Sequence, residues 1–95
     1  MSAYIIASIK VTDPEGYERY RQAVPGTIAA HGGRYLARGG AAEALEGDLE
    51  PNRLVIVEFP SYEQALAWYH SEEYQPIKRL RQASSESLLT IVDGC

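Results

Sequence analysis

Hydrophobic and polar residues alternate along four short segments of the chain, a period typical of strands. In residues 4–11, Ile5, Ala7, Ile9 and Val11 form an apolar face, with a mixed set of residues between them. Segments 34–38, 53–59 and 88–92 predict three further strands, and residues 53–59 carry the strongest β signal. The chain therefore supplies four strands for one sheet.

A helix is predicted between the first two strands. Asp13 and Pro14 favour a helix start, because aspartate can cap the first turn and proline suits its first position. The sheet-facing positions then recur at helical spacing, at Tyr17, Tyr20, Val24 and Ile28. Pro25 predicts a kink or a restart of this helix, since proline lacks an amide donor. Gly32 and Gly33 predict its end.

The last two strands also enclose helical segments. Ser61 and Gln64 predict a capping box. The positions that follow on one helical face are Tyr62, Ala65, Leu66 and Tyr69. After a break near Ser71, a shorter helix is expected to bury Ile77, Leu80 and Ser84.

The resulting order, strand–helix–strand–strand–helix–strand, predicts one α+β domain over residues 1–95. We expect a ferredoxin-like βαββαβ fold, in which both helical segments cover one face of a four-stranded antiparallel sheet. The other face would carry Tyr4, Ile6, Leu54 and Ile56, which are too apolar for water, beside Ser8, Lys10 and Glu58, which are too polar for a dry core. This mixture predicts a homodimer that encloses a partly polar cleft.

Composition narrows the classes of partner. The 95 residues are 45% hydrophobic and 23% charged, which is typical of a globular chain and not of a disordered one. The net charge of −4, with acids and bases interspersed, disfavours nucleic acids and anionic membranes. Cys95 is the only cysteine, no signal peptide precedes the first strand, and no apolar run spans a bilayer. We therefore expect a cytoplasmic protein.

Several segments together resemble the DUF1330 family, a group of small proteins in the dimeric α/β-barrel superfamily. The resemblance runs from residue 4 to residue 94, and its motifs lie at residues 11–17, 32–40, 46–47, 53–61, 67–69, 71–74 and 80–81. It implies the βαββαβ fold and a barrel-like dimer, and it implies no particular reaction. Pro25-Gly26 is a small departure that concerns local geometry only.

The candidate binding chemistry begins with Arg34, Arg38, Arg53 and Glu58. Arg34 and Arg38 are expected on one face of their strand, where Glu58 of the next strand could pair with one of them. A guanidinium left unpaired in a cleft would bind a carboxylate or an enolate. The alternative is a structural ion-pair network at the sheet edge or the dimer seam.

For the aromatic and histidine side chains, the sequence also leaves open a functional role and a structural role. Aromatic residues such as Tyr35, Tyr74 and Trp68 could line a pocket or simply pack the core and the dimer. His31 and His70 favour helix-end roles over general base catalysis, and no metal-ligand motif or phosphate-binding glycine loop is present in the sequence. No cofactor is expected. The candidate ligand-binding residues are Ser8, Arg34, Arg38, Glu58, Trp68 and Tyr69.

The segment 40–52 is longer than a tight hairpin requires. It could form a lid, a solvated loop or an arm that grips the second subunit, and the arm is the favoured interpretation. Two functions remain open for the whole chain. One is a dimer that binds a small, anionic metabolite in its cleft, with or without catalysis, by analogy with monooxygenases, isomerases and lyases of the same superfamily. The other is a non-enzymatic accessory dimer whose polar residues only hold the interface.

Overall fold

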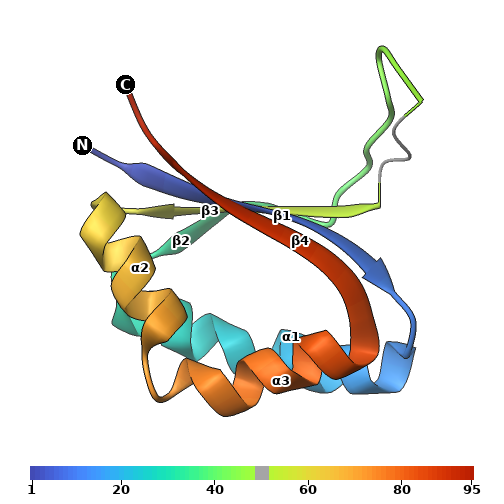
Figure 1. The fold of residues 1–95 in the computed structure, drawn as a ribbon, viewed down its shortest axis with the longest axis horizontal. Coiled ribbons are helices and arrows are strands. Elements are labelled where there is room, and N and C mark those ends of the chain that lie inside the picture. The colour runs from blue at the N-terminus through green and yellow to red at the C-terminus, as the bar shows by residue number, and fades with distance from the viewer. Residues whose placement is uncertain (49–51) are drawn as a thin grey trace.

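A computed structural model of the protein describes residues 1–48 and 52–95, and the elements of these residues follow the predicted order (Figure 1). They are β1 (Ala3–Val11), α1 (Pro14–Ala30), β2 (Arg34–Arg38), β3 (Arg53–Phe59), α2 (Tyr62–His70), α3 (Tyr74–Ser84) and β4 (Ser85–Asp93). The predicted break near Ser71 is confirmed, because it separates α2 from α3. The last strand begins earlier than predicted, since β4 follows α3 without a connecting loop.

The four strands form one antiparallel sheet in the order β2-β3-β1-β4. Figure 1 shows α1, α2 and α3 together on one side of this sheet. The predicted α+β ferredoxin-like fold is therefore confirmed. The opposite side, which we call the helix-free face, has no helix over it in the described part of the chain.

Strand register confirms which residues share each face. Ile5, Ala7 and Ile9 are buried toward the helices. On the helix-free face, Ile6 lies opposite Ile56, and Ser8 lies opposite Leu54. The side chains on this face are partly apolar and open to solvent, with Ile6 40% and Leu54 36% exposed. The mixed face predicted from the sequence is thus present.

Aromatic residues fill the core between the sheet and the helices. Trp68 is 2% exposed and lies with its ring centroid 4.2 Å from that of Tyr74. Its indole nitrogen donates a hydrogen bond of 3.0 Å to the Thr27 hydroxyl of α1, which ties α2 to α1. The hydroxyls of Tyr20 and Tyr74 share a hydrogen bond of 3.0 Å. These polar contacts satisfy the buried ends of large side chains, as a packed core requires.

Pro25 was predicted to kink or restart the first helix. A restart is excluded, because α1 continues through this residue as one helix of 17 residues, and a kink stays a prediction. A proline inside a helix leaves the carbonyl four residues earlier without its usual amide donor. In α1 that carbonyl belongs to Arg21, and a side chain from the sheet supplies the missing donor. The helix can therefore accommodate Pro25.

The long connection between β2 and β3 leaves the sheet on the side away from the helices (Figure 1). Its described residues 41–48 are exposed. Residues 49–51 lie outside the described part, so the predicted arm stays a prediction.

Candidate ligand-binding site

A β-bulge in β2 decides where the predicted arginines lie. Arg34 pairs with Glu58, but the register shifts between Tyr35 and Ala37, so that Arg38 pairs with Val55. One extra residue reverses the direction of every later side chain in a strand. The prediction that Arg34 and Arg38 share a face is therefore wrong. Arg34 lies on the helix-free face, and Arg38 points toward the helices.

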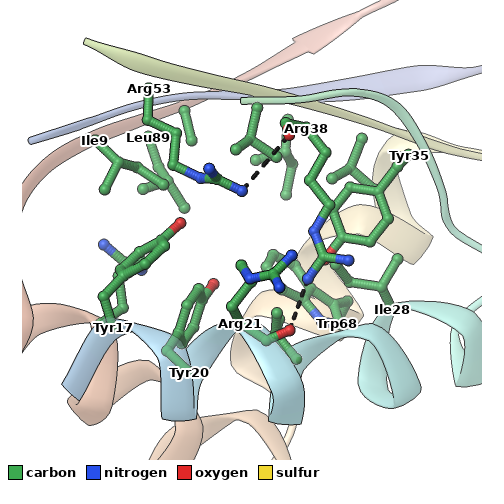
Figure 2. Close-up of a pocket in the computed structure, with 16 residues that line it drawn as sticks. Ile9, Tyr17, Tyr20, Arg21, Ile28, Tyr35, Arg38, Arg53, Trp68 and Leu89 are labelled. Carbon is green, nitrogen blue, oxygen red and sulfur yellow. Dashed lines mark hydrogen bonds between the residues drawn. The ribbon is translucent and has the colours of Figure 1, made fainter. Parts of the chain in front are cut away.

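Arg38 is one of four arginines that line a pocket between the sheet and the helices. Arg38 and Arg53 come from the sheet, Arg21 from α1 and Arg81 from α3. Figure 2 shows Arg38 and Arg53 reaching from the strands toward α1, where Tyr17 and Tyr20 point back toward the sheet. The space measures about 460 Å³, including the part open to solvent. We call it the arginine pocket.

The walls of the arginine pocket are apolar and aromatic. They consist of Ile5, Ala7, Ile9, Tyr17, Tyr20, Val24, Ile28, Tyr35, Val55, Val57, Trp68 and Leu89 in addition to the four arginines. No aspartate or glutamate is among these lining residues. An apolar pocket with a few convergent polar groups is the usual form of a small-molecule site. Here all of the charged groups are cations.

Only one of the four arginines has a carboxylate partner within residues 1–48 and 52–95. Arg21 forms an ion pair of 3.0 Å with Glu18 on the same helix. Arg53 donates a long hydrogen bond of 3.5 Å to the Arg38 carbonyl, and Arg81 donates one of 2.5 Å to the Ser87 hydroxyl. The Nε atoms of Arg53 and Arg81 are buried without a hydrogen-bond partner. Such groups raise the free energy of the folded state unless a ligand or water satisfies them.

Pro25 and Arg38 position each other. Because Pro25 has no amide hydrogen, the Arg21 carbonyl is left without a helical donor. The Nη2 atom of Arg38 donates to that carbonyl at 2.6 Å. The same guanidinium lies 4.5 Å from the centre of the Tyr35 ring. The Arg21 carbonyl that Pro25 leaves without a donor thus holds the Arg38 side chain across the pocket, as Figure 2 shows.

Gly39 makes room for Arg53. Its backbone has φ of 72°, a conformation that glycine adopts without strain. A β-carbon at this position would collide with the Arg53 guanidinium. Gly39 therefore ends β2, as predicted, and also lets Arg53 lie close to the backbone.

The tyrosines of the arginine pocket are expected to act as neutral hydrogen-bonding groups. Burial raises the pKa of Tyr35 above its ordinary value of 10.0. Burial also raises the pKa of Tyr20, to which the neighbouring Tyr74 contributes. Both phenols therefore keep their protons at neutral pH, and phenol groups can donate hydrogen bonds to an anion. A protonated phenol of this kind is a hydrogen-bond donor and not a general base at neutral pH.

The structure separates the six predicted site residues. Arg38 and Trp68 line the arginine pocket. Arg34 and Glu58 line a small depression near Gly32 and Pro60, Tyr69 lines spaces beside β4, and Ser8 lies on the helix-free face. Tyr17, Tyr20, Arg21 and Arg81 were not among the predicted site residues. For Arg81 a signal exists, because it lies seven residues after the buried Tyr74 and so shares its helical face.

Glu58 pairs with an arginine, as predicted. Its carboxylate accepts a hydrogen bond of 2.6 Å from Arg34 Nε and one of 3.3 Å from the Tyr4 hydroxyl. The Arg34 hydrogen bond holds the pKa of Glu58 below its ordinary value of 4.5. This network lies on the helix-free face and is separate from the arginine pocket.

The Glu58 network predicts a loss of stability in acid. Above pH of about 4.5 the carboxylate is charged in both folded and unfolded chains, so the pairing contributes fully. As the pH falls through the lowered pKa, the unfolded chain binds the proton first and this contribution disappears. Glu58→Gln should therefore show a shallower fall in the free energy of unfolding between about pH 5 and pH 3.

Urea titrations at several pH values would measure this difference. Glu86→Gln, at an exposed position of β4, is the matched control and should keep the wild-type pH dependence. If the free energy of unfolding falls equally with pH in Glu58→Gln and in the wild type, the pairing does not stabilise the fold.

The histidines lie at helix ends. His31 is the C-terminal cap of α1, and its Nδ1 lies 2.9 Å from the Thr27 carbonyl. His70 is the last residue of α2. The structure brings Glu73 to 4.0 Å from His31 Nε2, a neighbour that the sequence did not place there. Across the described ranges, no three side chains of His, Cys, Asp or Glu gather where they could hold a metal ion.

The fold and the relatives of the chain define its class. The structure is a ferredoxin-like α+β protein with a cationic pocket under its sheet. The chain belongs to the DUF1330 family, a domain of unknown function, whose model matches residues 2–95. A comparison with curated proteins gave no match. Within the described residues, no helix has the length and apolar character needed to cross a membrane.

Solved structures share this fold at low sequence identity. The RPA0582 protein of unknown function from Rhodopseudomonas palustris has a TM-score of 0.81 at 18% identity, over 99% of this chain and 82% of that one. A dimeric ferredoxin-like protein of unknown function from Jannaschia sp. CCS1 has a TM-score of 0.69 at 13% identity, over 99% and 100%. SnoaB, a cofactor-independent oxygenase from Streptomyces nogalater, has a TM-score of 0.68 at 12% identity, over 99% and 93%.

Proposed function

We propose that the protein self-associates through its helix-free face and that each subunit binds a small organic anion in the arginine pocket. One observation carries the binding proposal. Arg38, Arg53 and Arg81 line the arginine pocket, and among residues 1–48 and 52–95 none of them has a carboxylate partner. Guanidinium groups held near an apolar wall without counter-ions favour an anionic ligand, which would compensate their charge.

The chemistry of the pocket indicates the ligand class. The guanidinium groups suit a carboxylate or an enolate, which accepts paired hydrogen bonds. Tyr17, Tyr35 and Trp68 provide aromatic walls against which a planar ring can pack. The enclosed part of the pocket has room for about two water molecules. A larger ligand therefore requires the half-buried Arg38 side chain to release the Arg21 carbonyl and move.

Self-association is supported by the helix-free face. Ile6, Leu54, Leu88 and Val92 are exposed there, beside Ser8 and the Glu58 network. The similar protein from Jannaschia sp. CCS1 is described as dimeric. Two sheets packed face to face would give the barrel-like dimer of the dimeric α/β-barrel superfamily. The described part of the connection between β2 and β3, residues 41–48, extends on this side, where it would contact the second subunit (Figure 1).

The second candidate function is a non-enzymatic accessory dimer. It is favoured by one observation, because Arg34, Glu58 and Tyr4 satisfy one another on the helix-free face. This pairing supports an interface role for these residues rather than ligand binding. The likeness to SnoaB shows the fold alone, so the proposal is limited to binding and includes no reaction.

A thermal-shift screen of aliphatic carboxylates, aromatic carboxylates and enolisable ketones tests the binding proposal. A ligand that binds only the folded chain raises its Tm by mass action. Arg38→Met should weaken binding of the best ligand at least about tenfold, the effect of losing one charged hydrogen bond. Arg19→Met removes the same charge from an exposed position of α1 and should bind like the wild type.

Two results would contradict the proposal. One is a folded wild-type protein that responds to none of these anions. The other is an equal ligand response in Arg38→Met and the wild type. Loss of self-association in Arg38→Met would instead support the accessory function, because Arg38 would then hold the assembly together.

A further inference from the structure

A second polar space adjoins Arg81 where α3 passes directly into β4. It is lined by Tyr69, Arg81, Gln82, Ser85, Ser87 and Leu89 and measures about 540 Å³, including the part open to solvent. Arg81 lines both this space and the arginine pocket, so its side chain forms part of the wall of each. We call this second space the serine recess.

Arg81 is a charged residue that is almost fully buried. Its exposed fraction is 4%, and its Nε atom has no hydrogen-bond partner in the described part of the chain. Its Nη1 donates to the Ser87 hydroxyl at 2.5 Å, and no ion pair joins it to the described residues. A buried guanidinium without a counter-ion is strongly unfavourable. A bound anion would compensate the positive charge of Arg81.

The other groups that line the serine recess can donate hydrogen bonds. Ser87 accepts from Arg81 through its oxygen, so its own hydroxyl hydrogen is available to a ligand. The Tyr69 hydroxyl and the Gln82 amide also line the recess and can donate hydrogen bonds. The Lys78 ammonium lies 4.9 Å from the centre of the Tyr69 ring and adds positive charge nearby. Among residues 1–48 and 52–95, no acidic side chain lines the recess.

We propose that the serine recess binds a small oxyanion, either phosphate or the carboxylate group of a metabolite. Its oxygens would accept hydrogen bonds from Ser87 and Tyr69 and would compensate the charge of Arg81. Donors without a competing carboxylate select an oxyanion over a cation or a neutral molecule. Because Arg81 lines both spaces, an anion in either space would compensate its charge, and the variants described below distinguish the two.

Titration of the whole chain with inorganic phosphate, and separately with acetate, tests the site at constant ionic strength. At about 100 times Kd, the better anion should raise the Tm by about 10–20 °C. It should also shift the backbone amide signals of Gln82, Ser85 and Ser87 in two-dimensional NMR spectra. The stronger of the two anions identifies the group as a phosphate or a carboxylate.

Matched variants locate the bound anion. The double variant Tyr69→Phe with Ser87→Ala removes two hydroxyls without changing the charge, and should weaken binding at least about tenfold. Gln82→Leu, at an exposed position, is a second test that leaves the bond between Arg81 and Ser87 intact. Arg53→Met, which alters the arginine pocket and not the lining of the recess, should leave the phosphate-induced shifts of the Ser85 and Ser87 amide signals unchanged.

Three outcomes would overturn the proposal. The first is the absence of any response of the folded wild type to phosphate and acetate. The second is wild-type affinity in both recess variants. The third is loss of the phosphate-induced Ser85 and Ser87 amide shifts in Arg53→Met, which would place the anion in the arginine pocket instead.

Discussion

Ile6→Glu is expected to convert the self-associated protein into single chains. Ile6 lies near the middle of the helix-free face, opposite Ile56 on β3 and Thr90 on β4. In a two-fold dimer each substitution occurs twice, so one change buries two carboxylates at the interface. Like charges brought together and desolvated cost several kcal/mol. We expect dissociation to become at least about 100-fold more favourable, equivalent to about 2.7 kcal/mol.

Sedimentation equilibrium over a wide concentration range would measure this change. Leu66→Glu is the matched control, because Leu66 is 36% exposed but lies on α2, away from the helix-free face. It should assemble like the wild type. Ile6→Glu should also remain folded, since the side chain is 40% exposed in the single chain. A wild type that sediments as one chain at high concentration would contradict self-association.

The fold could be predicted because its signals are local and repeated. Alternation in residues 4–11 placed Ile5, Ala7 and Ile9 on the buried face, and register with β3 follows from that alternation. The capping prediction was also correct in part, because the Ser61 hydroxyl accepts a hydrogen bond from the Gln64 amide. The Gln64 side chain instead donates to the His31 carbonyl. Such a long-range alternative leaves no local signal.

The candidate site could be predicted only in part, because two local irregularities determine it. The bulge between Tyr35 and Ala37 turns Arg38 toward the helices, and nothing in a five-residue strand marks a bulge in advance. Pro25 was recognised as a helix defect, but the group that compensates it comes from β2. The sequence therefore identified Arg38 as a candidate binding residue, but it predicted the wrong face of β2 for this side chain.

The arginine pocket and the helix-free face use opposite sides of the same sheet. Val55 and Val57 of β3 line the pocket, whereas Leu54 and Glu58 of the same strand belong to the other face. A ligand in the pocket and a second subunit on the helix-free face therefore would not compete for side chains. Variants can separate the two properties, because Ile6→Glu should leave ligand binding intact and Arg38→Met should leave assembly intact.

Arg53→Met is expected to make the ligand-free protein more stable while it removes ligand binding. Within the described residues, the Arg53 Nε is buried without a partner, and its Nη2 makes a 3.5 Å hydrogen bond to the Arg38 carbonyl. Its guanidinium carbon lies 5.5 Å from the centre of the Tyr17 ring. Methionine fills similar space without a charge and can pack against the same ring. Removal of the unsatisfied donor should raise the free energy of unfolding by about 1–2 kcal/mol.

This opposite change in stability and binding distinguishes a binding residue from a structural one. Each kcal/mol corresponds to about 4–8 °C in Tm for a chain of this size, which calorimetry resolves easily. Arg79→Met, at an exposed position of α3, should change stability by no more than about 0.5 kcal/mol. Arg53→Lys should retain part of the ligand response, because the charge remains while the planar donor pair is lost. If Arg53→Met were less stable than the wild type, the contacts with Tyr17 and Arg38 would outweigh the unsatisfied charge, and Arg53 would be a structural residue.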